Sequence, residues 1–128
     1  MSNKRFSQRI MIGIVVAIFT TAIAIPSYYE ATIRHSKESV LQGNLAAMRT
    51  VIKWYVQDKH RPPQSLQDLV TAGYFRELPS DPMTNSNSSW KPEIGDVVIS
   101  AEKTQRGIAD VHSGSSAQSS NGTTYSGW

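Results

Sequence analysis

A run of 20 residues without a charged side chain, residues 10–29, constrains this chain more than any other feature. As a helix that rises 1.5 Å per residue, the run would span roughly 30 Å, the thickness of the hydrocarbon core of a bilayer. We therefore predict a transmembrane helix over residues 10–29. It would follow a basic cytoplasmic segment over residues 1–9.

The distribution of charge supports a membrane orientation. Lys4, Arg5 and Arg9 precede the run, and subtracting these three from the 13 Lys and Arg leaves ten basic against ten acidic side chains. Basic residues stay on the cytoplasmic side of a membrane helix. The predicted localisation is the bacterial inner membrane, single-pass, with the N-terminus cytoplasmic, the C-terminal domain periplasmic and the lipid bilayer as a partner. The neutral remainder offers no basic patch for phosphates, which excludes nucleic acid as a partner.

Two alternatives to an anchor exist for the run. A cleaved signal peptide would show the same basic and apolar regions, and Ala22 and Ala24 fit a small-x-small cleavage site. A buried core helix would need a larger core than a chain of 128 residues can build. Pro26 either kinks a continuous helix or ends it, and we expect the continuous helix with at most a kink.

An amphipathic helix is predicted to continue the same spine over residues 30–60. Its apolar residues recur at steps of three and four, which is the period of one helical face. They are Ile33, Val40, Leu41, Leu45, Met48, Val51, Ile52, Tyr55 and Val56. We expect Leu45, Met48, Ile52 and Tyr55 to face a β-sheet and to form the core with Leu66, Leu69 and Val98.

Residues 61–128 are predicted to form a small α+β periplasmic domain with a C-terminal tail. Pro62 and Pro63 should end the long helix, and Ser65 with Asp68 has the spacing of a capping box that opens a short helix. Strands are expected at residues 90–94, 97–101 and 108–111, with the last two as a hairpin. The tail, residues 113–128, has a disordered composition, but Tyr125 and Trp128 predict that it folds back onto the sheet.

The sequence offers no catalytic, cofactor-binding or metal-binding residues, and we predict that the protein is not an enzyme. It contains no cysteine and no glycine-rich phosphate loop. His35 and His60 lie too far apart along a helix to share a metal, and Asp110 and His112 accompany scattered serines as chance would allow. Three acidic residues could line a calcium site between loops or cap turns, with capping favoured: Asp81, Asp96 and Asp110.

Several segments in order resemble the type IV pilin and type II secretion pseudopilin superfamily, in its major-pseudopilin-like branch. They are AIAIPSYYEA at residues 22–31, RPPQSLQDLV followed by GY at residues 61–74, LPSDPMT at 78–84, Trp90, GIADVHSGS at 107–115 and NGTTYSGW at 121–128. The resemblance covers nearly the whole chain.

This resemblance implies a pilin-like α+β fold, in which a long N-terminal helix, transmembrane in its first half, packs on a small antiparallel sheet. It implies a membrane-anchored structural subunit of a type II secretion pseudopilus or a type IV pilus-like filament. The implied partners are other pilin-like subunits and an inner-membrane assembly platform, and the filament could be extracellular. The alternative function is a periplasmic binding or accessory module with a cleaved signal peptide.

The chain departs from this family at its N-terminus. Prepilins carry a glycine before the cleavage site and a glutamate shortly after it, whereas Lys4-Arg5-Phe6 has no glycine and Arg9 or Ile10 stands where the glutamate belongs. We therefore expect the N-terminus to remain uncut. The tail also lacks the acidic ligands of the calcium site found in many major pseudopilins, so no calcium is predicted.

Overall fold

The chain folds into a long helix followed by a short helix, a β-hairpin and a 3-10 turn. In the computed structural model these are α1 (Ser2–Lys59), α2 (Gln67–Thr71), β1 (Lys91–Ser100), β2 (Lys103–His112) and η1 (Tyr125–Gly127). The structure describes the backbone of residues 2–128 and the side chains of residues 4–20 and 27–128. It divides into two compact units, Met1–His35 and Ser36–Trp128.

Helix α1 confirms that the apolar run and the amphipathic segment belong to one helix. Thr20 donates a hydrogen bond from Oγ1 to the carbonyl oxygen of Val16 at 3.1 Å, the back-bonding that threonine makes in helices. The expected kink at Pro26 and the cleavage pattern at Ala22 and Ala24 concern side chains outside the described residues.

The predicted inner-membrane localisation is wrong. A bilayer crossing takes about 20 predominantly apolar residues, and no helix within the described residues combines the necessary length and apolarity. The described residues therefore do not support the transmembrane helix that was predicted over residues 10–29.

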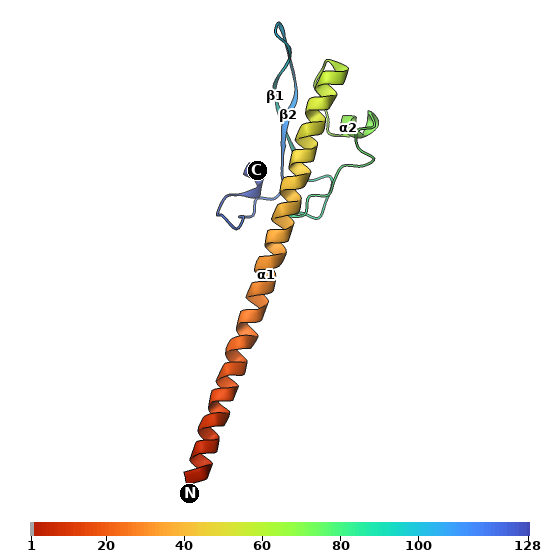
Figure 1. Cartoon of the computed structure of the whole chain (residues 1–128). Coiled ribbons are helices and arrows are strands. Elements are labelled where there is room, and N and C mark those ends of the chain that lie inside the picture. Colours follow the sequence, from red (N-terminus) through yellow and green to blue (C-terminus); the bar gives the residue numbers. More distant parts are fainter. Residues whose placement is uncertain (1) are drawn as a thin grey trace. The chain divides into compact units, whose positions relative to one another are not determined.

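The second unit is built on the C-terminal part of α1, along which the β1–β2 hairpin runs (Figure 1). The predicted stripe supplies half of the core, and α2, β2 and the C-terminal segment supply most of the rest. The buried apolar residues are Leu41, Leu45, Met48, Val51, Ile52, Tyr55, Leu66, Leu69, Trp90, Ile108, Val111 and Tyr125. The predicted stripe is confirmed from Leu41 to Tyr55, whereas Ile33 and Val40 are exposed and Val56 is half-buried and outside the core. Val98 is 69% exposed and does not belong to the core as expected.

Helix α1 ends where the two prolines predict. His60 has a φ of 53° and donates its amide to the carbonyl oxygen of Val56 at 3.0 Å, so the chain leaves the helix through a left-handed residue. Pro62 and Pro63 are buried behind it. In the first turn of α2, Asp68 accepts hydrogen bonds from the amide and the hydroxyl of Ser65, as the capping-box spacing suggested, although Leu66 holds the N-cap position.

The sheet has two antiparallel strands instead of the three segments that the sequence predicts. The two segments at 90–94 and 97–101 merge into β1 because Gly95 and Asp96 continue the strand opposite Gly107 and Arg106. Small residues face each other here, since a Cβ on Gly95 would lie 3.3 Å from the Cβ of Ala109. The register shifts between Glu93 and Ile94, which marks a β-bulge.

Two glycines of the second unit offer a matched test of the backbone. A Cβ on Gly43, inside α1, meets nothing within 4 Å, whereas Gly73 ends α2 with a φ of +84°. We expect Gly43→Ala to raise the free energy of unfolding by roughly 0.5–1 kcal/mol, and Gly73→Ala to lower it by about 1 kcal/mol or more. Denaturant unfolding of the full chain measures both. Equal effects of the two substitutions would contradict this assignment.

Candidate functional site

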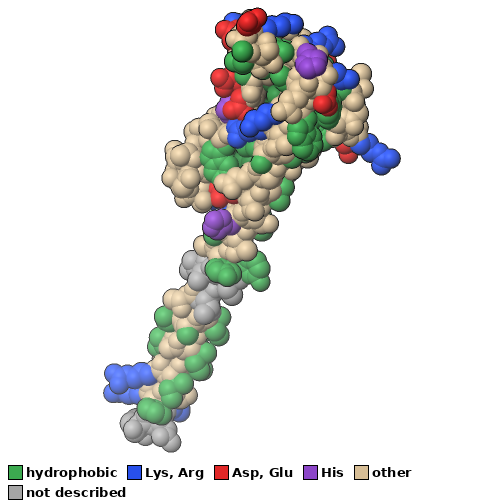
Figure 2. Space-filling view, turned by 45° about the horizontal axis from the view of Figure 1, so that its top comes forward, with side chains coloured by type: hydrophobic (Ala, Val, Ile, Leu, Met, Phe, Trp, Pro, Cys, Tyr) green, Lys and Arg blue, Asp and Glu red, His purple; other side chains and the backbone are tan. Residues whose placement is uncertain are grey.

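The first candidate surface is the apolar segment of the N-terminal unit, which we define as the described residues 6–19 of α1. Nine large apolar side chains there are each 49–68% exposed: Phe6, Ile10, Met11, Ile12, Ile14, Val15, Val16, Ile18 and Phe19. Figure 2 shows exposed hydrophobic side chains along the visible face of this unit. Their positions go round the whole helix, so the segment has no single polar face.

The second feature ties the C-terminal segment to α1, and we call it the Glu38 clasp. Glu38 is 4% exposed. Its carboxylate accepts hydrogen bonds from the amide of Ser120 at 2.7 Å, the Ser120 hydroxyl at 2.6 Å and the Tyr125 hydroxyl at 2.9 Å. A buried carboxylate is tolerated when hydrogen-bond donors replace water. The sequence alone assigned no role to Glu38.

Arg49 makes a similar connection between α1 and β2. Its Nε donates to Oδ1 of Asp110 at 2.6 Å, and Nη2 donates to the carbonyl oxygens of Val111, at 3.0 Å, and Trp128. Burial alone would raise the pKa of Asp110. Hydrogen bonds from the Val111 amide and Arg49, together with the positive charge of Arg49, outweigh burial and lower the pKa. Asp110 is therefore held as a carboxylate.

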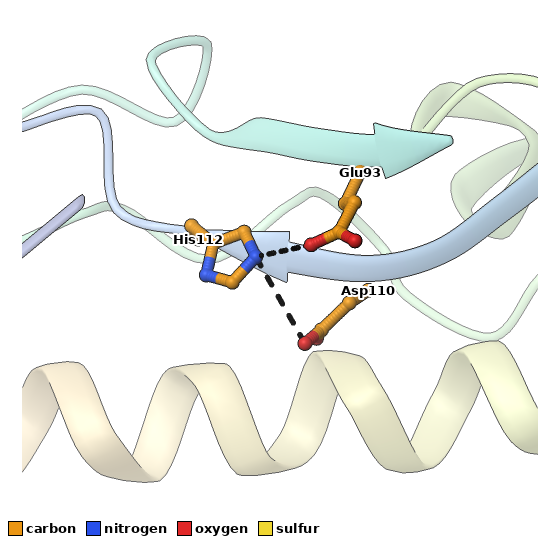
Figure 3. A group of neighbouring side chains, drawn as sticks. All are labelled: Glu93, Asp110 and His112. Atoms are coloured by element: carbon orange, nitrogen blue, oxygen red, sulfur yellow. Dashed lines mark hydrogen bonds and ion pairs between the residues drawn. The ribbon is translucent and has the colours of Figure 1, made fainter. Parts of the chain in front are cut away.

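The third feature is a mixed cluster on the hairpin, formed by Glu93, Asp110 and His112 and called here the hairpin cluster. Figure 3 shows the Nε2 edge of His112 facing both carboxylates. Nε2 lies 3.0 Å from Oε2 of Glu93 and 3.9 Å from Oδ2 of Asp110. Glu93 and Asp110 are direct partners in the strand register, and Lys91 is the partner of His112.

The structure separates the three acidic residues that the sequence singled out. Asp81 is fully buried and caps a turn by accepting the amide of Met83 at 2.8 Å, and it also accepts the hydroxyl of Ser113 at 2.7 Å. Asp96 lies in β1 and is exposed. Asp110 lies in β2 and forms an ion pair with Arg49 of α1. The turn-capping interpretation therefore holds for Asp81 alone. Ser113, the serine next to His112 in sequence, donates its hydroxyl to Asp81.

The sequence interpretation missed the hairpin cluster. Asp110 and His112 stand two residues apart, which places both on one face of a strand, but Glu93 joins them only through the cross-strand register. A strand break expected at Gly95 concealed that register. The cluster could have been predicted from Glu93 in one strand and the Asp-x-His pattern of Asp110 and His112 in the next.

Comparisons with known proteins return no relative. No family model, no curated protein and no solved structure matches this chain.

Proposed function

We propose that this chain is a structural subunit of a filament of the type IV pilin and type II secretion pseudopilin class, without a catalytic role. Copies would assemble with one another, or with similar subunits, by packing the apolar segment of α1. The single observation that carries the proposal is the exposure of nine large apolar side chains on residues 6–19.

Exposed apolar surface of this extent requires an external cover. A helix that is apolar on every side is normally buried, and a large exposed apolar patch marks an interaction site. Burying one large apolar side chain contributes roughly 1.5–3 kcal/mol. Helices of neighbouring copies can cover the segment from several directions, and this arrangement generates a filament.

The distribution of charge along α1 supports such packing. Between Ile10 and Thr20 the described residues carry no charge, and the basic side chains of Lys4, Arg5 and Arg9 precede them. The apolar stripe of α1 in the second unit is not part of this assembly surface, because its six apolar residues between Leu41 and Tyr55 are buried in the core of that unit. In this proposal the first part of α1 forms the assembly surface, and its second part contributes half of the core of the second unit.

Disulfide cross-linking tests this proposal on the full chain, which has no cysteine of its own. Ile10 and Phe19 are nine residues apart and lie about 180° apart around the helix. In an Ile10→Cys/Phe19→Cys variant, oxidation should link each copy to neighbours on two sides and produce a ladder of oligomers. A matched variant with exposed polar sites on the second unit, Gln57→Cys/Glu102→Cys, should remain largely monomeric.

A charge in the apolar segment should abolish this ladder. Val15 is 51% exposed, so Val15→Asp leaves the isolated subunit folded, but it places an unpaired carboxylate in the packed interface, at a cost of several kcal/mol. We expect at least tenfold less cross-linked product and unchanged unfolding of residues 36–128. A monomeric Ile10→Cys/Phe19→Cys variant, or equal ladders from both pairs, would overturn the proposal and favour an accessory binding module.

A further inference from the structure

We propose that the hairpin cluster binds a divalent transition metal ion of the zinc class. Glu93, Asp110 and His112 each offer one ligand atom, and these atoms all lie within 4.8 Å of one another. The site is independent of the apolar segment on which the filament proposal rests.

The distances suit a small tetrahedral ion. Zinc binds imidazole nitrogen and carboxylate oxygen at roughly 2.0–2.2 Å, which places neighbouring ligand atoms about 3.4 Å apart. Nε2 of His112 lies 3.0 Å from Glu93 Oε2 and 3.9 Å from Asp110 Oδ2, so each of these two distances differs from the tetrahedral value by about half an ångström. The ligand atoms of the two carboxylates lie within 4.8 Å of each other. Calcium would need six to eight oxygen ligands, and an imidazole is a poor one for it.

The two neighbouring carboxylates of the hairpin cluster also favour a bound cation. Glu93 and Asp110 face each other directly across the two strands, and like charges at such positions destabilise a sheet. Arg49 occupies Oδ1 of Asp110, which leaves Oδ2 on the side of His112. A divalent ion between the two carboxylates would neutralise the remaining repulsion.

The backbone holds the ligands in place from both sides. The β-bulge next to Glu93 changes the direction of the side chains at this point in the hairpin, and Arg49 fixes the carboxylate of Asp110 from α1. The side chain of Glu93 is 63% exposed, so the fourth position of the metal is open to water or to a ligand from a neighbouring molecule.

The second nitrogen of His112 sets the expected affinity. A metal on Nε2 requires a neutral imidazole that carries its proton on Nδ1, and Nδ1 is buried and has no hydrogen-bond partner among the described residues. Metal-binding histidines normally donate this proton, and losing such a partner weakens binding by about 10–100-fold. We therefore expect a micromolar rather than a nanomolar site.

Calorimetric titration of ZnCl₂ into the metal-free full chain tests the inference. One zinc ion per chain should bind in the micromolar range, and His112→Ala and Glu93→Gln should each weaken binding at least tenfold. The matched controls His60→Asn and Glu102→Gln change exposed residues elsewhere and should bind as the parent chain does. Asparagine suits the left-handed backbone of residue 60.

Other outcomes would overturn the site. They are the absence of zinc binding to the parent chain, binding that His112→Ala and Glu93→Gln leave unchanged, and equal binding of CaCl₂. If His112→Ala fails to fold, Glu93→Gln still decides, because that side chain is largely exposed. In the parent chain, nuclear magnetic resonance should show zinc shifting the ring signals of His112 and not those of His60. A shift confined to His60 would contradict the proposal.

Discussion

Replacing Ile52 with alanine is expected to lower the free energy of unfolding of the second unit by about 2–5 kcal/mol. Ile52 is 4% exposed and lies in the core with residues from α2, β2 and the C-terminal segment. Removing three carbon atoms from a packed core costs both their burial and the cavity left behind. Denaturant unfolding of the full chain, followed by tryptophan fluorescence, to which the buried Trp90 contributes, measures the loss.

Val40 provides the matched control for this truncation. It lies on the same helix but is 50% exposed, so Val40→Ala should change the free energy of unfolding by no more than about 0.5 kcal/mol. Equal effects of the two substitutions, or a negligible effect of Ile52→Ala, would mean that the stripe does not form the core.

Replacing Glu38 with alanine is expected to cost about 2–4 kcal/mol, because it removes the acceptor of three hydrogen bonds. The buried Tyr125 hydroxyl would lose one acceptor, and the loss of this buried hydrogen bond accounts for most of the cost. The C-terminal segment should become accessible at the same time, so limited proteolysis should cleave it faster in Glu38→Ala than in the parent chain.

Two further variants make the Glu38 measurement specific. One changes the same position and the other changes a different glutamate. Glu38→Gln keeps one acceptor oxygen and should fall between the parent chain and Glu38→Ala. Glu102→Ala, at an exposed position in the β1–β2 turn, should be close to neutral. Unaltered stability and proteolysis of Glu38→Ala would show that the clasp does not hold the C-terminal segment.

Periodicity predicted those parts of the fold that depend on local sequence. The stripe from Leu41 to Tyr55 follows from a spacing of three and four, and the end of α1 follows from Pro62 and Pro63. The return of the tail was foreseen from Tyr125, which is 3% exposed in the core. In each case the residue types at these positions are compatible with few other local structures.

Features that depend on strand register or on long-range partners were not foreseen. Gly95 has the local properties of a turn residue, but its pairing with Gly107 keeps it in a strand. Val98 has strong β propensity and nevertheless faces solvent, because propensity does not say which face of a strand is covered. The hairpin cluster needs the same register, and Glu38 could be recognised as buried only once residues 120 and 125 were placed beside it.

The Glu38 clasp has a consequence for the order in which a newly made chain can fold. Its partners lie 82 and 87 residues further along the sequence, and Arg49 reaches Trp128 across 79 residues. Contacts this distant form late, because a long loop must close before any of them is gained. During synthesis the stripe of α1 therefore emerges long before the segment that helps to cover it. A half-made subunit would present both that stripe and the segment at residues 6–19, which makes early shielding from other nascent chains a requirement of its biogenesis.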